Sequence, residues 1–385
     1  MKKRVLFRGP LLTLSGYGVH SRQVFQWLDS REDFEVKSQV LPWGITPWIL
    51  DGNRQNGLIG KIFESTNLDN LSGFDYSFQV QLPNEWDPSL ANFNVGITAA
   101  VETDRCSPQW IEACNKMDHI VVPSEHTKKV LENSGPLSVP VTVVPESYPD
   151  GLIPSGESLG LDTDFNFLMF GQITGNNPWN DRKNTYFCLK WLCEIFKDDP
   201  DVGIVIKTNH GKNTKVDRKL TQSMLKNLLS ECRTGEYPKV YLLHGELTEE
   251  EIADVYSDES IKALVAPSRG EGYGLPLLEA AACSLPVIAT NWSGHLDFLN
   301  KGKFIKLNYE LKPIHESRVD NAIFLNGFRW AEVSEEDFKK KVSKFRKASS
   351  IPKEWAKDLS STIREEYSQD AISERYNLLL RELNK

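Results

Sequence analysis

The chain has 385 residues, of which 40% are hydrophobic and 25% are charged, as in ordinary globular proteins. At roughly 100–200 residues per domain, this length predicts two or three domains with a large core, and it excludes disordered, collagenous and disulfide-stapled proteins. The formal net charge of -8 does not indicate nucleic acid or an anionic membrane as a partner. None of the six cysteines forms a C-x-x-C pair, which favours free thiols over a zinc or redox site.

The first half of the chain alternates between predicted strands and predicted helices. It opens with an apolar strand at residues 4–8, a loop of small residues at 9–18 and a helix at about 20–30. The further strands expected are 75–81, 95–100, 120–122 and 141–144, and the further helices are 108–116 and 125–133. This alternation predicts a parallel, doubly wound α/β sheet.

A stretch rich in proline and glycine at residues 146–163 indicates a domain boundary. A second α/β half follows it. Its expected strands are 165–170, 202–207, 240–244, 263–266 and 286–289, with helices at 185–196 and 220–232 and from Thr248, and a helical tail from about 335. We therefore expect an N-terminal domain at 1–155, a C-terminal domain at 156–355 and a helical tail at 356–385 that packs back on the N-terminal domain.

The apolar run after Lys2, Lys3 and Arg4 is only a few residues long. A signal peptide needs roughly 7–15 apolar residues and a membrane span roughly 18 or more. We expect a cytoplasmic protein with at most peripheral membrane contact.

Residues 266–290 carry the most information about function. A predicted strand ends in a loop with three glycines, and a helix starts near Pro276. Glycines allow close backbone approach, and a helix N-terminus attracts anions, so this loop suits a diphosphate. Two carboxylates, Glu271 and Glu279, accompany it and could accept hydrogen bonds from hydroxyl groups. A nucleotide sugar carries hydroxyls on both sides of its diphosphate.

This segment resembles the E-x7-E segment of retaining glycosyltransferases of GT-B architecture, family 4 in particular. The resemblance implies two Rossmann-like domains that face a central cleft. It also implies that Glu271 contacts the donor sugar and Glu279 the ribose of the nucleotide. The backbone of the loop would hold the diphosphate, through Gly272, Tyr273, Gly274 and Leu275.

Other segments resemble the same family in the expected order. Lys183 matches a family lysine that neutralises the diphosphate, whereas Gln172 stands where the family has an arginine. Because adjacent residues at a helix start point in different directions, we expect Lys183 to be the principal phosphate contact. Arg182 or Lys207 would replace the missing arginine. Residues 243–247, including Leu247, resemble the segment whose backbone reads the nucleotide base.

In the N-terminal half, Gly16 and Gly18 resemble the family's first glycine loop, which faces the donor phosphate and the acceptor. Many relatives carry a histidine near the reacting sugar, but here the predicted strand is followed by Glu102 and Asp104. These two carboxylates are the acceptor-side candidates for catalysis, with His20 a weaker one. The D-x-D pattern at residues 162–164 precedes a strand, so we interpret it as chance and expect no metal.

The resemblance implies a metal-independent enzyme that moves a hexose-type sugar from a nucleotide-diphosphate sugar to a glycan-type acceptor, with no other cofactor. Residues 1–160 hold 13 Lys and Arg against 19 Asp and Glu, which disfavours a strongly anionic acceptor. One alternative is a phage-type enzyme that modifies hydroxylated DNA bases, favoured by a basic run at residues 339–347. Another is a non-catalytic protein that binds a sugar nucleotide. A dinucleotide oxidoreductase is disfavoured because Ser21 stands where a third glycine would be needed.

Overall fold

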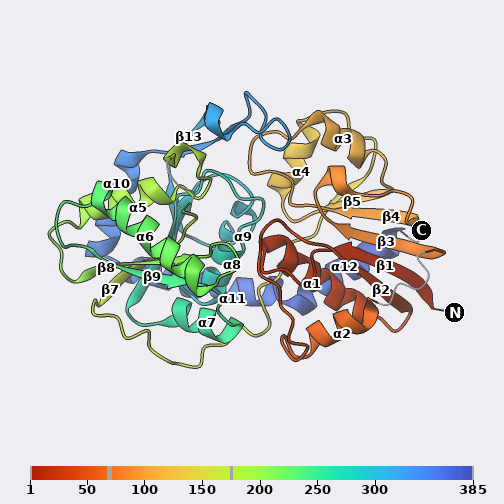
Figure 1. Ribbon diagram of the computed structural model, residues 1–385, viewed down its shortest axis with the longest axis horizontal. Coiled ribbons are helices and arrows are strands. Elements are labelled where there is room, and N and C mark those ends of the chain that lie inside the picture. Colours follow the sequence, from red (N-terminus) through yellow and green to blue (C-terminus); the bar gives the residue numbers. More distant parts are fainter. Residues whose placement is uncertain (1, 67–71, 174–176, 384–385) are drawn as a thin grey trace. The chain divides into compact units, whose positions relative to one another are not determined.

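The computed structural model describes residues 2–66, 72–173 and 177–383 (Figure 1). The chain divides into two compact units. Unit 1 consists of Met1–Ser147 and Gln369–Lys385, and unit 2 consists of Tyr148–Ser368. Compared with the expected division, the boundary lies after Ser147, and the residues expected as one helical tail are shared between the units.

Unit 1 is built on a six-stranded parallel sheet with the order β2-β1-β3-β4-β5-β6. Its strands are β1 (Lys3–Gly9), β2 (Phe34–Val40), β3 (Phe74–Val80), β4 (Ala91–Ile97), β5 (His119–Val122) and β6 (Val141–Val143). Its helices are α1 (Gly16–Asp29), α2 (Leu58–Ser65), α3 (Pro108–Cys114), α4 (Glu125–Glu132) and α12 (Gln369–Leu383). Of these elements, β2 and α2 were not expected from the sequence.

Helix α1 begins four residues earlier than the sequence predicts. The hydroxyl of Ser15 caps the helix by accepting a hydrogen bond from the backbone N–H of Gly18, at 3.0 Å. A Cβ atom on Gly18 would lie 2.1 Å from the carbonyl oxygen of Thr13, so this close approach requires glycine. Gly16 and Gly18 therefore belong to the first turn of a helix.

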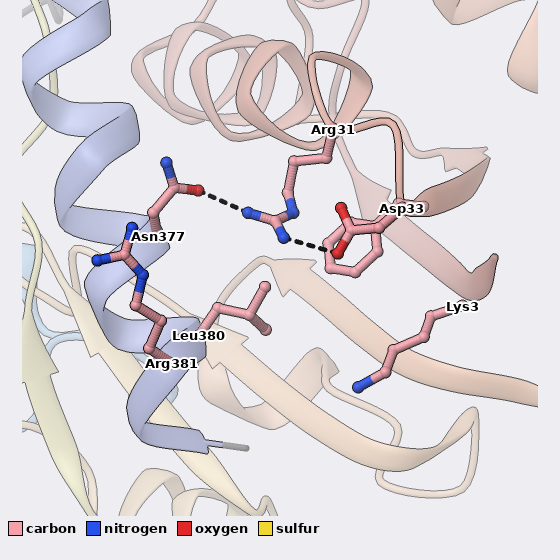
Figure 2. A pocket seen from close by; sticks show the side chains of 7 residues that line it. Lys3, Arg31, Asp33, Asn377, Leu380 and Arg381 are labelled. Carbon is pink, nitrogen blue, oxygen red and sulfur yellow. Dashed lines mark hydrogen bonds and ion pairs between the residues drawn. The ribbon is translucent and has the colours of Figure 1, made fainter. Parts of the chain in front are cut away.

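Helix α12 completes unit 1 by packing on α1. The ring of Trp27 stacks on that of Tyr376, with centroids 4.7 Å apart, and its Nε1 donates to Oδ1 of Asn377 at 2.9 Å. Figure 2 shows a second link, in which Arg31 donates to Asn377 at 2.8 Å and to Asp33 at 2.7 Å. Arg31, Asp33 and Asn377 line a pocket of about 390 Å³ beside α12.

Unit 2 repeats the arrangement with a parallel sheet in the order β12-β11-β10-β7-β8-β9. Its strands are β7 (Phe165–Phe170), β8 (Val202–Thr208), β9 (Lys239–His244), β10 (Ile261–Ala266), β11 (Val287–Thr290) and β12 (Ile305–Leu307). Its helices are α5 (Thr185–Ile195), α6 (Lys215–Cys232), α7 (Glu249–Ser257), α8 (Leu275–Ala282), α9 (Leu296–Leu299), α10 (Glu335–Lys347) and α11 (Ser350–Glu366). Two parallel sheets with helices confirm the predicted α/β class.

The central strands of the unit 2 sheet fix where its loops lie. Strands β7 and β10 are neighbours although they are far apart in sequence, so the strand order reverses between them. In such sheets the loops at the carboxyl ends of the strands part at this point and leave room for a ligand. Lys183 lies in the loop after β7 and Glu271 lies in the loop after β10. Both residues were candidates for the site in the sequence.

An antiparallel hairpin of β13 (Tyr309–Pro313) and β14 (Arg329–Val333) follows β12. No strand is predicted here from the sequence. Within the described ranges, no helix combines the length and the apolar character that a membrane crossing needs.

Candidate functional site

The glycine loop after β10 turns into helix α8 at Gly274. This residue has a φ of +103°, and a Cβ atom on it would lie 3.1 Å from the Cβ of His295. Glycine is therefore required on both conformational and steric grounds. The loop is buried from Glu271 to Gly274, and the ring of Tyr273 packs on that of Phe298, with centroids 5.3 Å apart. Leu275 is the first residue of α8.

The side chain of Glu271, which is 4% exposed, is held by two cations from the loop after β7. Lys183 Nζ donates to its two oxygens at 2.7 and 3.0 Å, and Arg182 Nη1 donates to Oε2 at 2.9 Å. The expectation that Arg182 and Lys183 point in different directions is therefore wrong. Both precede the helix, in a turn that ends at Asn184 with a φ of +57°. Gln172 is exposed at the end of β7.

The ion pairs determine the charge of Glu271. Burial alone would raise the pKa of its carboxyl group, but Lys183 and Arg182 lower it to about 2. The group is thus a carboxylate throughout the pH range in which proteins are normally assayed.

A hydrogen-bond chain that the sequence analysis missed fixes the backbone of Glu271. Its N–H donates to Ser293 Oγ at 3.0 Å, and its carbonyl oxygen accepts from Gly294 N at 2.9 Å. His295 Nε2 lies 2.7 Å from the carbonyl oxygen of Thr290 and must be the donor, so Nδ1 is the acceptor that faces Ser293 at 3.3 Å. Burial lowers the pKa of His295, which favours this neutral form. Chain positions 293–295 carried no sequence signal for this role.

Glu279 lies one turn into α8. Its Oε2 accepts a hydrogen bond from the buried Tyr256 hydroxyl at 2.9 Å. Burial raises the pKa of Glu279 to about 7, although the Tyr256 hydrogen bond opposes the rise. Burial and ion pairing thus shift the two carboxyl groups in opposite directions, the pKa of Glu279 upward and that of Glu271 downward.

Lys207 lies at the end of β8 and is directed to another loop. Its ammonium donates to the carbonyl oxygen of Gly245 and, at 2.8 Å, to Oδ1 of Asn209. Burial lowers its pKa to about 8. It therefore supports the loop that leads to Leu247, which is half-buried, whereas Arg182 and Lys183 meet at Glu271.

The candidates in unit 1 lie around the start of α1 and the loop after β4. Strand β4 ends at Ile97, so Glu102 and Asp104 lie farther along the loop than the sequence suggested. Both are half-buried, and Asp104 lies 3.8 Å from Arg105. His20 is buried with Nδ1 4.0 Å from Glu146, and burial lowers its pKa to about 3.

The sequence also contains an acidic D-x-D pattern and a basic run, and side chains of both take part in ion pairs. In the described part of the chain, no group of three or more His, Cys, Asp or Glu side chains is arranged to hold a metal ion. In the D-x-D pattern, Asp162 pairs with Lys239 at 3.3 Å. In the basic run, Lys339 pairs with Glu194 and Glu335, and Lys341 pairs with Asp337.

Two Rossmann-like units, one with a carboxylate and two cations beside a glycine loop, match the arrangement that the resemblance to GT-B glycosyltransferases implies. Residues 216–357 match the family described as Glycosyl transferases group 1. The match confirms the resemblance found in the sequence, and it includes Glu271 and Glu279.

Three relatives illustrate the similarity. A probable sucrose-phosphate synthase of Thermosipho melanesiensis is 26% identical over 202 residues, which are 50% of this chain and 43% of that protein, so the match spans less than half of the relative. The sucrose-phosphate synthase structure from Thermosynechococcus elongatus has a TM-score of 0.67 at 13% identity and covers 99% of both chains. HepE from Anabaena, solved with UDP-glucose, has a TM-score of 0.62 at 12% identity, covering 98% of this chain and 99% of that one. These structures confirm the GT-B fold.

Proposed function

We propose that the protein is a retaining glycosyltransferase that moves a hexose-type sugar from a nucleotide-diphosphate sugar to a hydroxyl of a glycan-type acceptor. The observation that carries the proposal is the meeting of Arg182, Lys183 and Glu271 where the loops after β7 and β10 part. The two cations suit a diphosphate, and the carboxylate suits sugar hydroxyls. The UDP-glucose complex of the Anabaena relative supports UDP as the first nucleotide to test.

In this proposal the chain acts mainly by positioning and by charge stabilisation. As the bond between sugar and diphosphate breaks, negative charge grows on the leaving phosphate. Lys183, Arg182 and the N-terminus of α8 stabilise that charge, while Glu271 orients the sugar. A leaving phosphate on the same face as the acceptor can take the acceptor's proton, which would retain the configuration at the sugar.

The proposal includes independence from metal ions, because two side-chain cations are available for the task that a divalent ion performs in other transferases. Turnover should therefore survive treatment with EDTA. A loss of turnover that manganese or magnesium restores would contradict this part of the proposal.

The experiment for the proposal as a whole is a comparison of UDP, GDP and ADP by thermal shift, followed by turnover with the sugar conjugates of the nucleotide that binds. Lys183→Ala should lower kcat and kcat/KM together, by about 10²–10³. The matched control is Lys190→Ala on α5, a half-exposed lysine that lies 3.8 Å from Glu194. Near-normal turnover of the Lys183 variant, or no stabilisation by any of the nucleotides, would reject the proposed function.

A further inference from the structure

Arg269 is a fully buried arginine two residues before Glu271, and its exposed fraction is 0%. Its Nη1 donates to the carbonyl oxygens of Pro178 and Asp181 at 2.9 and 2.7 Å. On the other side, its Nε lies 2.7 Å from Oε1 of Glu332, and its Nη2 donates to Oε2 of Glu332 at 3.2 Å. The guanidinium thus links strand β14 to the turn that precedes α5.

Aromatic rings enclose this link. The guanidinium carbon lies 5.2 Å from the ring centre of Trp330, 5.5 Å from that of Trp179 and 5.8 Å from that of Phe187. Removing a guanidinium from water is costly unless its charge is paired and its N–H groups are hydrogen-bonded. Here the carboxylate of Glu332 pairs the charge, and two carbonyl oxygens and that carboxylate accept hydrogen bonds from Nη1 and Nη2.

The backbone of Arg269 strengthens the same link. Its N–H donates to the carbonyl oxygen of Arg182 at 2.8 Å, and its own carbonyl oxygen accepts from Ala331 N at 2.8 Å. One residue therefore holds the turn at three carbonyl oxygens, those of residues 178, 181 and 182. The carboxylate of Asp181 then accepts from the backbone N–H groups of Lys183 and Thr185, at 2.8 and 2.5 Å.

We infer that Arg269, held by Glu332 of the hairpin, is the positioning residue that directs Arg182 and Lys183 to the place where they meet Glu271. This inference rests on the proposed function only in taking the two cations as the contacts for a diphosphate. Lysine cannot replace Arg269 in this role, because a single ammonium lacks the planar fork that reaches two carbonyl oxygens and a carboxylate together. The hairpin, which contributes neither cation, controls the geometry of both.

The test compares Arg269→Lys, which keeps the charge, with Glu332→Gln, which keeps the shape of the partner. The matched control is Arg346→Lys, because Arg346 also lies over an aromatic ring, 4.6 Å from that of Phe165, and pairs with Asp199 at 3.2 Å. The first measurement needs no nucleotide. It is the rate at which acetic anhydride acylates Lys183, read by mass spectrometry, with Lys207 in the same sample as the internal reference.

In the wild-type protein Lys183 is shielded, since its side chain is 20% exposed and paired with Glu271. We expect acylation of Lys183 to become several-fold faster in Arg269→Lys and in Glu332→Gln, with Lys207 unchanged, because the loosened turn would release the ammonium. In Arg346→Lys the rate for Lys183 should stay at the wild-type value. A purely structural role would lower the melting temperature without this selective change.

The second measurement compares the binding of UDP with that of uridine by calorimetry. Misdirected cations should weaken UDP binding by roughly tenfold or more, the equivalent of one charge-assisted hydrogen bond, and leave uridine binding unchanged. Wild-type reactivity of Lys183 in both variants would overturn the inference, even if their stability fell. If Arg269→Lys fails to fold, the acylation rate of Lys183 in Glu332→Gln alone decides whether the inference holds. If the wild-type protein binds no UDP, the proposed nucleotide is rejected, while the acylation result still decides the role of Arg269.

Discussion

Glu271 is the side chain on which the charge balance at the carboxyl ends of β7 and β10 depends. Its carboxylate is the anion that Arg182 and Lys183 bind. A diphosphate that approaches the same two cations is repelled by this negative charge, and the repulsion makes its binding free energy less favourable. In the proposed function, Glu271 would thus lower the affinity for the nucleotide product while it orients the donor sugar.

Replacing this carboxylate should strengthen nucleotide binding and slow turnover. We predict that Glu271→Gln binds UDP several-fold more tightly than the wild-type protein and loses about 10²-fold in kcat, because an amide frees the cations but no longer acts on the sugar as an anion. Calorimetry with UDP and steady-state kinetics measure the two effects. Weaker UDP binding together with unchanged kcat would assign Glu271 to nucleotide binding instead.

Glu279 provides a prediction on pH. Its pKa is raised to about 7 by burial. In the proposed function, hydroxyl groups of the ribose would donate to the ionised carboxylate. Nucleotide binding should therefore strengthen as the pH rises through about 7 and weaken below it. UDP titrations between pH 5.5 and 8.5, chosen to span roughly 1.5 units on either side of that pKa, measure the profile.

The control for this profile is Glu279→Gln, which has no charge to gain and should lose the part of the pH dependence that Glu279 supplies, whereas the titrations of Lys207, whose pKa is about 8, and of the terminal phosphate of UDP are common to both proteins. The Glu271 carboxyl, whose pKa is about 2, stays ionised throughout and adds no slope. A Glu279→Gln profile as steep as that of the wild-type protein would show that Glu279 is not responsible.

At the scale of elements, the start of α8 depends on a conformation that only glycine adopts easily. We predict that Gly274→Ala destabilises the fold by about 1–3 kcal/mol, because it combines a positive φ with a Cβ contact of 3.1 Å to His295. Thermal unfolding measures the loss. Gly16→Ala is the matched control, since a Cβ there meets nothing within 4 Å and alanine favours a helix. Equal losses in both variants would contradict the argument.

The strand, loop and helix around the E-x7-E segment could be predicted because turn, cap and apolar pattern agree there. β10, α8 and β11 fall within two residues of their expected positions. The β13–β14 hairpin could not be predicted, since β13 is short and largely exposed and β14, although mostly buried, is short and carries no clear alternation. The convergence of Arg182 and Lys183 was also missed, because helix geometry was applied to residues that precede the helix.

For the whole molecule, the net charge of -8 and the pairing of Lys339 and Lys341 with carboxylates argue against duplex DNA as the acceptor. We predict no salt-sensitive binding to a duplex that carries hydroxylated bases, measured by fluorescence anisotropy from low to physiological salt. A basic DNA-binding domain serves as the positive control. Tight binding that weakens steeply with added salt would favour the DNA-modifying alternative over the glycan acceptor.

Helix α12 also bears on how the protein is made. Unit 1 needs the ring of Tyr376 against Trp27, yet the whole of unit 2, residues 148–368, is translated between the two partners. The ribosome therefore synthesises all of unit 2 before α12 can pack on the apolar face of α1. A pause or a premature stop in the codons for unit 2 would leave that apolar face open to chaperones and proteases.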